Sequence, residues 1–542
     1  MSGPRLPLAS HARRGQDFTA NLSRGDAGAQ FVANVGSNIA FVAVTMISML
    51  LFVPYLIRNL GVAAYGAISL ANLVVLYVAT FSSGITSAAT RFLAIDLGRH
   101  DDAAANATFN SAIAASAAFI AAALLPLLAV GLYSPSLFRV PETLEWQTRI
   151  LLLCAALYAL LNLIVDCFSA STVILHRFEI RNALRALGLL LRISTVLLLF
   201  AIVDPQVWHI GAGLVLSVMV SLFASRYICR MLTPQLRVAS SDFDRSRAGE
   251  LAAFSGWALL NSIGILLFAT SDLIVINQFF GATATGHFAV LVLFPEVIRQ
   301  GMDAITSVTN PSILARYARR DLDGLRDYTL RAVKLIALGL VLPVGLLVGL
   351  AQPLLELWLG SDFAHLKGQL MVMSFPICVT MATLPLSYVL TAYNKVRVQS
   401  QFTAACGIVC LLAAVAAARW GGQGPVGVVM ASASLLVIRS CVLIPAYAGK
   451  VTGWGSLAIY RHLMIGVLAT ALVALAAHSL ASLSVTPSWQ VCASIAAAVT
   501  VPYLVIAATC LMNGGDRAVI ASVFPFKTLL PLPTSDWRHR QP

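Results

Sequence analysis

The stretch NLGVAAYGAISL (residues 59–70) has a counterpart in FFGATATGHFAV (residues 279–290). An offset of 220 residues aligns Gly61 with Gly281 and Gly66 with Gly286, so both glycines of the first stretch have a counterpart in the second. Self-similarity at a fixed and long period is the sequence signature of an internally repeated architecture. The chain is therefore predicted to contain two copies of one structural unit.

The composition indicates the environment of these copies. The chain has 542 residues, of which 59% are hydrophobic and 11% charged, and its mean hydropathy is +0.84. Soluble domains carry about 25% charged residues, so this composition is typical of a polytopic membrane protein. The formal net charge of +13 is located mainly in short loops. There it sets topology, and we expect no nucleic-acid partner.

Apolar runs long enough to cross about 30 Å of hydrocarbon as helices recur along the chain. Fourteen such spans are predicted, at residues 31–57, 66–90, 109–132, 149–173, 184–203, 207–229, 251–276, 288–311, 332–358, 368–392, 400–418, 425–447, 462–482 and 489–512. Spans 1–6 and 7–12 form the two copies, which share one orientation because six crossings return the chain to its starting side. Spans 13 and 14 lie outside the repeat.

Basic residues in the loops test this assignment. Alternate loops and the two tails carry 28 Arg and Lys residues, and the opposite loops carry 5. The positive-inside rule then places both termini in the cytoplasm. The expected fold is an all-α polytopic membrane protein with two parallel six-helix lobes and two C-terminal helices. Its parts are a cytoplasmic tail (1–30), an N-lobe (31–230), a cytoplasmic linker (231–250), a C-lobe (251–447), helices 13 and 14 (448–512) and a second cytoplasmic tail (513–542).

Several kinds of site have no signature in the sequence. The nine cysteines fall in or beside predicted spans, and no Cys or His group has zinc spacing. A P-loop, an HExxH motif and a GxSxG motif are also lacking, so we expect neither a cofactor nor catalysis. The N-terminal tail is polar for about 30 residues before a full-length span, which is not the pattern of a signal peptide.

The segment FPEVIRQGMDAITSV (residues 294–308) places charges inside the eighth predicted span. Glu296, Arg299 and Asp303 are three and then four residues apart, so on a helix they share one face. Charges at this depth cost about 3 kcal/mol each and should face water, protein or substrate. The charged stripe is interpreted either as part of a substrate or proton site, or as an ion triad that only holds helices together.

Two loop sequences carry a family resemblance: LGVAAYG (residues 60–66) and ATRFLAIDLGRHDDAAANATFNSA (residues 89–112). With the 6+6+2 helix pattern, the chain from about residue 34 to 512 resembles the Wzx-type polysaccharide flippases of the multidrug/oligosaccharidyl-lipid/polysaccharide exporter superfamily. The resemblance implies a bacterial inner-membrane protein that moves lipid-linked oligosaccharide to the outer leaflet for O-antigen, capsule or exopolysaccharide. A polymerase and a chain-length regulator of the same pathway are the implied protein partners.

Three alternatives remain open at this stage. FLAIDLGRHD (residues 92–101) is also similar to a loop motif of major facilitator transporters, although the leading Gly and first Arg of that motif are missing. A MATE-like drug antiporter would share the superfamily. A glycan polymerase would need a larger outer loop than the predicted one at residues 133–148.

The resemblance places spans 1, 2, 7 and 8 at a central cavity, which suggests roles for polar residues within the spans. Arg299, with Arg439, is predicted to hold the substrate's pyrophosphate while Glu296 and Asp303 orient Arg299. The predicted glycan-facing residues are Asn38 and Asn261, and Asp272 is a candidate for ion coupling. Asp166 and Arg192 lie 13 residues on either side of Glu179, so they are predicted to pair across a helical hairpin.

Overall fold

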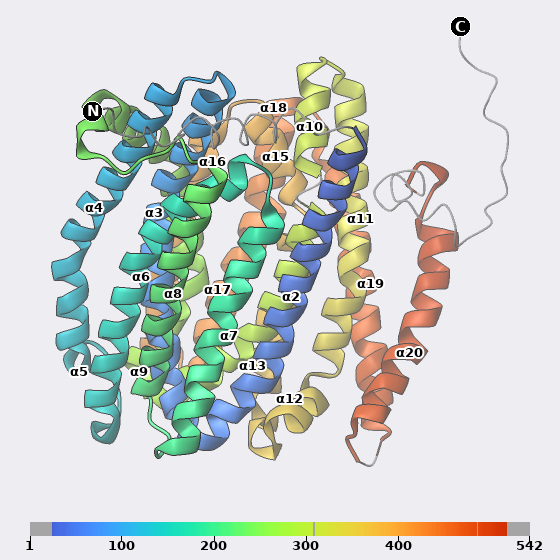
Figure 1. Ribbon diagram of the computed structural model, residues 1–542. Helices are drawn as coiled ribbons and strands as arrows, with labels where there is room; N and C mark the ends of the chain where they lie inside the picture. The colour runs from blue at the N-terminus through green and yellow to red at the C-terminus, as the bar shows by residue number, and fades with distance from the viewer. Residues whose placement is uncertain (1–23, 307–308, 485, 517–542) are drawn as a thin grey trace, which may run out of the picture. The chain divides into compact units, whose positions relative to one another are not determined.

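The computed structural model describes residues 24–306, 309–484 and 486–516; within these ranges the side chains at 24–29, 31–32, 240, 251–261, 304, 396 and 456 are not described. The described chain is helical and contains no strand. Its α-helices (Figure 1) are α2 (Arg24–Leu60), α3 (Val62–Gly98), α4 (Asp102–Leu132), α5 (Ser134–Leu137), α6 (Glu145–Ile174), α7 (Phe178–Ile202), α8 (Trp208–Leu232), α9 (Arg245–Thr306), α10 (Thr309–Ala318), α11 (Leu322–Gly349), α12 (Ala351–Leu359), α13 (Lys367–Ser374), α14 (Ile377–Thr380), α15 (Leu384–Ala392), α16 (Val396–Trp420), α17 (Pro425–Ile438), α18 (Ile444–Thr452), α19 (Ser456–Ser482) and α20 (Trp489–Ile506). Short 3₁₀ segments are η1 (Glu142–Leu144), η2 (Ser240–Asp242) and η3 (Ser361–Leu366), and π-helical turns are η4 (Arg439–Leu443) and η5 (Ala507–Leu511).

The described residues contain 13 helices that are long and apolar enough to cross a membrane. One of them, Ser262–Asp303, has 42 residues. At 1.5 Å per residue such a helix would measure about 63 Å, roughly twice the hydrocarbon thickness. The backbone at Gly281 is not helical (φ 81°, ψ −176°), so α9 is two helices joined at this glycine. These two helices are the predicted seventh and eighth spans, and the all-α polytopic fold is confirmed.

The bend at Gly281 has its counterpart in the first copy of the repeat. Gly61 separates α2 from α3 with φ 85° and ψ 165°, nearly the conformation of Gly281. Positive φ with an extended ψ is open to glycine and strained for other residues. The paired glycines therefore mark the same backbone turn, 220 residues apart.

A second turn repeats at the same offset. His100, between α3 and α4, has φ 56°, and Arg320, between α10 and α11, has φ 58°. The next residue in each case, Asp101 or Asp321, caps the following helix by accepting a hydrogen bond from the backbone N–H three residues later, at 2.9 Å. Two separate turns thus show that the repeat extends beyond sequence to backbone conformation.

The starts of the repeated helices cross at very close range. A Cβ placed on Gly66 would lie closer than 3.0 Å to the carbonyl oxygen of Ala282, and one on Gly286 would lie closer than 3.0 Å to that of Val62. Adding 220 to the numbers of Val62 and Gly66 gives those of Ala282 and Gly286, so the contact is reciprocal. The glycines are required because only a residue without a side chain allows this approach.

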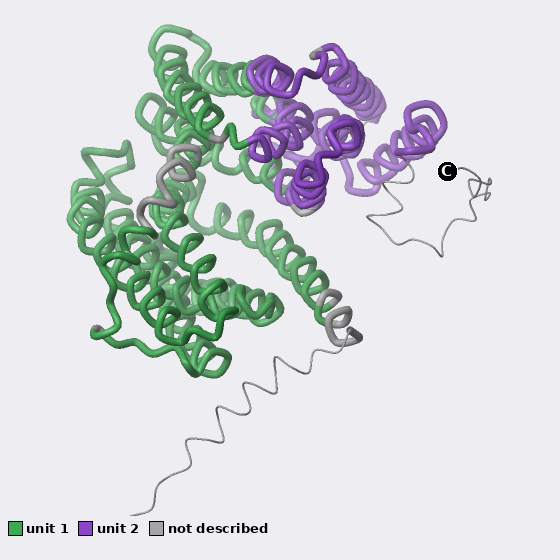
Figure 2. The backbone as a smooth tube through the Cα atoms, turned by 90° about the horizontal axis from the view of Figure 1, so that it is seen from above, with its two compact units in different colours: residues 1–297, 368–373, 394–439 green, residues 298–367, 374–393, 440–542 purple. Residues whose placement is uncertain are grey.

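The described chain forms two compact units (Figure 2). Unit 1 comprises residues 24–297, 368–373 and 394–439, and unit 2 comprises residues 298–367, 374–393 and 440–516. In unit 1, α6 packs against α3 and α8. In unit 2, α11 packs against α19, with Gly345 against Val473 and Gly466 against Ala337. The lobe boundaries predicted from the sequence remain a prediction.

Candidate functional site

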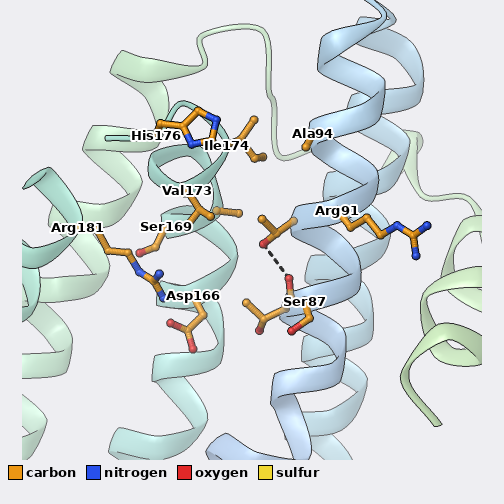
Figure 3. Close-up of a pocket in the computed structure, with 12 residues that line it drawn as sticks. Ser87, Arg91, Ala94, Asp166, Ser169, Val173, Ile174, His176 and Arg181 are labelled. Carbon is orange, nitrogen blue, oxygen red and sulfur yellow. Dashed lines mark hydrogen bonds between the residues drawn. The ribbon is translucent and has the colours of Figure 1, made fainter. Parts of the chain in front are cut away.

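Two adjoining cavities lie among the helices of unit 1. The larger, of about 520 Å³, lies between α3, α6 and the start of α7 (Figure 3). The other, of about 460 Å³, extends among α2, α6, α7 and α8. Both are lined by Asp166, Ser169 and Arg181, so they meet at these residues. We call the first the hydroxyl pocket, for Thr86, Ser87, Thr90 and Ser169, and the second the arginine pocket, for Arg181, Arg185 and Arg192.

The arginine pocket takes its charge from one face of α7. Arg181, Arg185 and Arg192 are four and then seven residues apart, which places them on one side of a helix. Gly188 also lines the pocket, and a Cβ at this position would lie 3.3 Å from Ser221 Oγ of α8. The Arg185 guanidinium lies 4.8 Å from the ring centroid of Phe41 on α2. The positive face of α7 is thereby turned toward α2 and α8.

Positive charge exceeds negative charge in this pocket. Among the described residues that line it, Asp166 is the only carboxylate, and its Oδ2 accepts a hydrogen bond from Asn162 Nδ2 at 3.4 Å. Within the described part of the chain, none of the three arginines has a carboxylate oxygen within 4.0 Å. All three lie in a helix that is apolar enough to cross the membrane. Arg192 lies near the middle of this helix, where a cation is costly, and a pocket with three arginines and one carboxylate suits an anionic ligand.

The predicted pair of Asp166 with Arg192 is wrong. The Asp166 carboxylate instead interacts electrostatically with Arg181 and Arg185, and Figure 3 shows Arg181 reaching toward it. The error lies in the hairpin. α6 ends at Ile174 and α7 begins at Phe178, so the turn is centred on His176 and not on residue 179. Ten residues on either side of this centre are Asp166 and position 186, which is next to Arg185.

Asn38 forms a contact between helices. Its Oδ1 accepts a hydrogen bond from Nδ2 of the buried Asn182 at 2.8 Å, which ties α2 to α7. Asn34 extends this contact by donating to the carbonyl oxygen of His176 at 2.8 Å. A glycan-facing role for Asn38 stays a prediction. Asn261 is on α9, but its side chain lies outside the described residues.

The charged stripe of residues 294–308 is helical as far as Thr306, and Ser307 and Val308 lie outside the described residues. Arg299 Nη1 is 3.4 Å from Asp303 Oδ2, and the two side chains are 48% and 47% exposed. Glu296 is half-buried one turn earlier. The structure thus brings two members of the predicted triad together and leaves them accessible.

Asp272 and Arg439 are both held by contacts inside unit 1. The buried Asp272 carboxylate accepts a hydrogen bond from the Ser432 hydroxyl of α17. Arg439 Nη2 donates to Thr403 Oγ1 of α16 at 3.2 Å, and the guanidinium lies 5.8 Å from the Phe268 ring centroid. Asp272 and Arg439 therefore connect α9 to α17 and to α16.

Arg181 and Arg185 were not singled out by the sequence analysis. The predicted fifth span began at residue 184, so Arg181 fell before it and Arg185 at its second residue, and both were counted with the basic loop. The observed α7 begins at Phe178 and includes both. Their spacing with Arg192 was the available signal, because basic residues of a loop need not follow a helical face.

A comparison with known families identifies the group to which the chain is related. A family model described as "Polysaccharide biosynthesis protein" matches residues 31–315, more than half of the chain. The chain belongs to this family. A relative from Bacillus subtilis (strain 168), named as the uncharacterized membrane protein EpsK, is 28% identical to this family member over 445 residues, which are 82% of this chain and 88% of EpsK.

Solved structures show the fold of this family member. It resembles an inward-facing multidrug resistance MATE transporter of the MOP superfamily with a TM-score of 0.62 and 13% identity, over 79% of this chain and 95% of that one. It also resembles a point mutant of the Vibrio cholerae MATE transporter VcmN with a TM-score of 0.52 and 16% identity, over 80% and 97% of the two chains. The protein is thus a multi-pass membrane protein with the MOP-superfamily fold, and the major facilitator alternative is wrong.

Proposed function

We propose that this member of the polysaccharide biosynthesis family moves polyprenyl-diphosphate-linked oligosaccharide from the cytoplasmic to the outer leaflet of a bacterial inner membrane by alternating access. The observation that carries the proposal is the excess of arginine over carboxylate in the arginine pocket. A guanidinium offers a planar fork of N–H donors that matches phosphate oxygens. Arg181, Arg185 and Arg192 are thus suited to a diphosphate headgroup, and the proposal assigns the chain neither a cofactor nor catalysis.

The location of the pockets supports the proposed direction of transport. The hydroxyl pocket includes Arg91, about two turns before the end of α3, and His176, in the turn that follows α6, and the loops on this side are rich in basic residues. The positive-inside rule assigns these ends to the cytoplasm, where lipid-linked oligosaccharides are assembled in this proposal. An anion that leaves a negative-inside cell gains about 2.3 kcal/mol per charge per 100 mV. A doubly charged headgroup would gain about twice that.

Arg299 is a second proposed headgroup ligand. Its ion pair with Asp303 is half-exposed, so the guanidinium can exchange a carboxylate for a phosphate without first leaving a buried environment. Glu296 and Asp303 would then orient Arg299 and compete with the phosphate for it, which allows release. Arg439 is the weaker candidate because Thr403 and Phe268 already hold its guanidinium.

A MATE-like cation-coupled drug antiporter is the alternative function. The buried Asp272 favours it, because a carboxylate enclosed within a membrane-spanning helix is suited to carry a proton or a cation. The arginine pocket disfavours it, since three arginines would repel a cationic drug. The two functions therefore make opposite predictions for variants of the arginine pocket.

Complementation of a deletion strain tests the proposal. The double variant Arg181→Ala/Arg185→Ala should be as abundant as the wild type, abolish polymer export and accumulate lipid-linked oligosaccharide on the cytoplasmic side. Arg226→Ala, which removes an exposed charge from α8 outside the pockets, is the matched control and should complement fully. Full complementation by a well-expressed double variant would overturn the assignment of the headgroup to this pocket.

A further inference from the structure

The arginine pocket continues into the hydroxyl pocket at Asp166, Ser169 and Arg181. A ligand whose diphosphate occupies the arginine pocket would therefore direct its next chemical group past Asp166. The hydroxyl pocket has about 520 Å³, within the range of about 300–1,000 Å³ that small-molecule sites occupy. This is space for a bound group of the ligand, and the walls of the pocket indicate which kind.

The polar walls of the hydroxyl pocket combine the cations of Arg91 and Arg181 with hydroxyl and carboxylate oxygens that accept hydrogen bonds. On α3, the hydroxyls of Thr86 and Thr90 donate to backbone carbonyls four residues earlier, at 3.4 and 2.8 Å. Their protons are thus engaged, and the oxygens remain available as acceptors. On α6, Asp166 adds a carboxylate, an acceptor when ionised. These walls fit a ligand group that is rich in donors.

The remaining walls are aliphatic or basic, and the basic side chain of Arg181 is turned toward Asp166 (Figure 3). Ala170, Val173 and Ile174 of α6 provide an aliphatic surface next to the acceptors. Figure 3 shows Arg91 extending away from Asp166, so its cation is not directed at the carboxylate. A pyranose ring has this combination of properties, with hydroxyl donors at its rim and C–H groups on its faces. A sugar that carries a carboxylate would instead meet Asp166 with the same charge.

We propose that the hydroxyl pocket binds the sugar attached directly to the diphosphate, and that Asp166 selects a neutral sugar by accepting its hydroxyl hydrogen bonds. The inference rests on the proposed function, because it takes the diphosphate to occupy the arginine pocket. Asp166 then interacts with two groups. Its charge partly balances that of the arginines, and its carboxylate accepts hydrogen bonds from the hydroxyls of the sugar.

Binding to the purified full-length protein tests this role, with three synthetic probes measured by calorimetry. The probes are geranylgeranyl diphosphate, the same lipid diphosphate bearing a neutral hexose, and the same bearing a uronic acid. The wild type should bind the neutral-sugar probe at least about tenfold more tightly than the bare diphosphate, because hydrogen bonds to a carboxylate are of the stronger class. It should bind the uronic acid probe more weakly than the neutral one.

Asp166→Asn should remove most of the preference for the neutral sugar and of the discrimination against the uronic acid. Affinity for the bare diphosphate should increase, because the variant removes a negative charge next to Arg181 and Arg185. Thr90→Val, a second variant that lies in the hydroxyl pocket only, should reduce the sugar preference alone. Asp204→Asn, which changes an exposed carboxylate outside both pockets, is the control and should alter none of the three affinities. Rescue of the sugar preference by Asp166→Glu would further support an acceptor role.

The outcomes separate the two proposals. If the wild type binds the bare and the neutral-sugar probes equally, or if Asp166→Asn lowers both affinities by the same factor, the sugar subsite is wrong and the headgroup site stands. If the wild type does not bind the bare diphosphate, or Arg185→Ala leaves that binding unchanged, the headgroup site fails and the subsite with it.

Discussion

Substituting Gly286 by alanine should destabilise the protein through a steric clash that can be located to single atoms. The added Cβ would lie 2.9 Å from the carbonyl carbon of Val62, 2.8 Å from its Cγ1 and still closer to its carbonyl oxygen. The carbonyl belongs to the first residue of α3, so relief requires a shift of the helix backbone and not only of a side chain. Overpacking of this kind costs about 1–3 kcal/mol.

Thermal unfolding of the purified protein in detergent is the measurement. Gly301→Ala on the same helix and Gly98→Ala on α3 are matched controls, because nothing lies within 4 Å of a Cβ at either position. In a helix, alanine is favoured over glycine by about 0.5–1 kcal/mol, so the controls should be neutral or stabilising. The reciprocal variant Gly66→Ala should behave like Gly286→Ala.

The double variant Gly66→Ala/Gly286→Ala adds a test of the shared contact. Once the first alanine has pushed the two helices apart, the second should cost less than it does alone, because both act on one crossing. Equal melting temperatures for Gly286→Ala and Gly301→Ala would refute the reasoning. Strict additivity in the double variant would show that the two glycines do not share a contact.

Three further predictions concern charge and topology. Arg299→Lys keeps the charge but loses the fork, so it should lower transport more than abundance, and Arg299→Ala should abolish polymer export; full complementation by a well-expressed Arg299→Ala protein would return the triad to a structural role. Burial acts to raise the pKa of Asp516, but hydrogen bonds from Lys334 Nζ at 2.6 Å and from the Asn513 backbone N–H lower that pKa overall. The stabilisation from this carboxylate should therefore be complete above its ordinary pKa of 3.8 and be lost as the pH falls through the lower pKa of the folded state. In a melting experiment at neutral pH, Asp516→Asn should lower the stability by about 3 kcal/mol. Reporter fusions should report the cytoplasm after Leu236, Gly324 and Gly515 and the outside after Ser136, Ala282 and Ser484, and one reversed pair would mean a miscounted span.

The fold could be predicted from the sequence because the bilayer restricts the solutions so strongly. A span must be helical and about 20 residues long, so apolar length alone locates it. Gly61 and Gly281 could be recognised as a repeated turn because a backbone with positive φ requires glycine, and that requirement is visible as a residue type. The 13 candidate spans of the structure become the predicted 14 when the helix around Gly281 is divided at its bend.

The pockets could not be predicted in the same way, because they depend on which faces of the helices meet. The orientation of the spans was predicted from the number of basic residues in the loops on each side. In that count Arg181 and Arg185 served only as two further basic residues that fix the orientation of the chain. Their second property, a common face on α7, becomes visible only once the helix is known to begin at Phe178. A shift of three residues in the centre of the α6–α7 turn was enough to assign Asp166 to the wrong arginine.

This dependence on register also explains how one set of arginines can serve two purposes. A basic residue near the cytoplasmic end of a span fixes orientation during insertion, and that demand does not specify the side of the helix on which it lies. Arg181 and Arg185 lie close to the start of α7 and satisfy the demand as well as a loop arginine would. Because they face Asp166 and the pockets as well, the charge that orients α7 is also available to bind the anionic headgroup of the proposed substrate. Moving either arginine by two positions along α7 would keep the first property and lose the second, so variants with a transposed arginine would insert correctly and fail to transport.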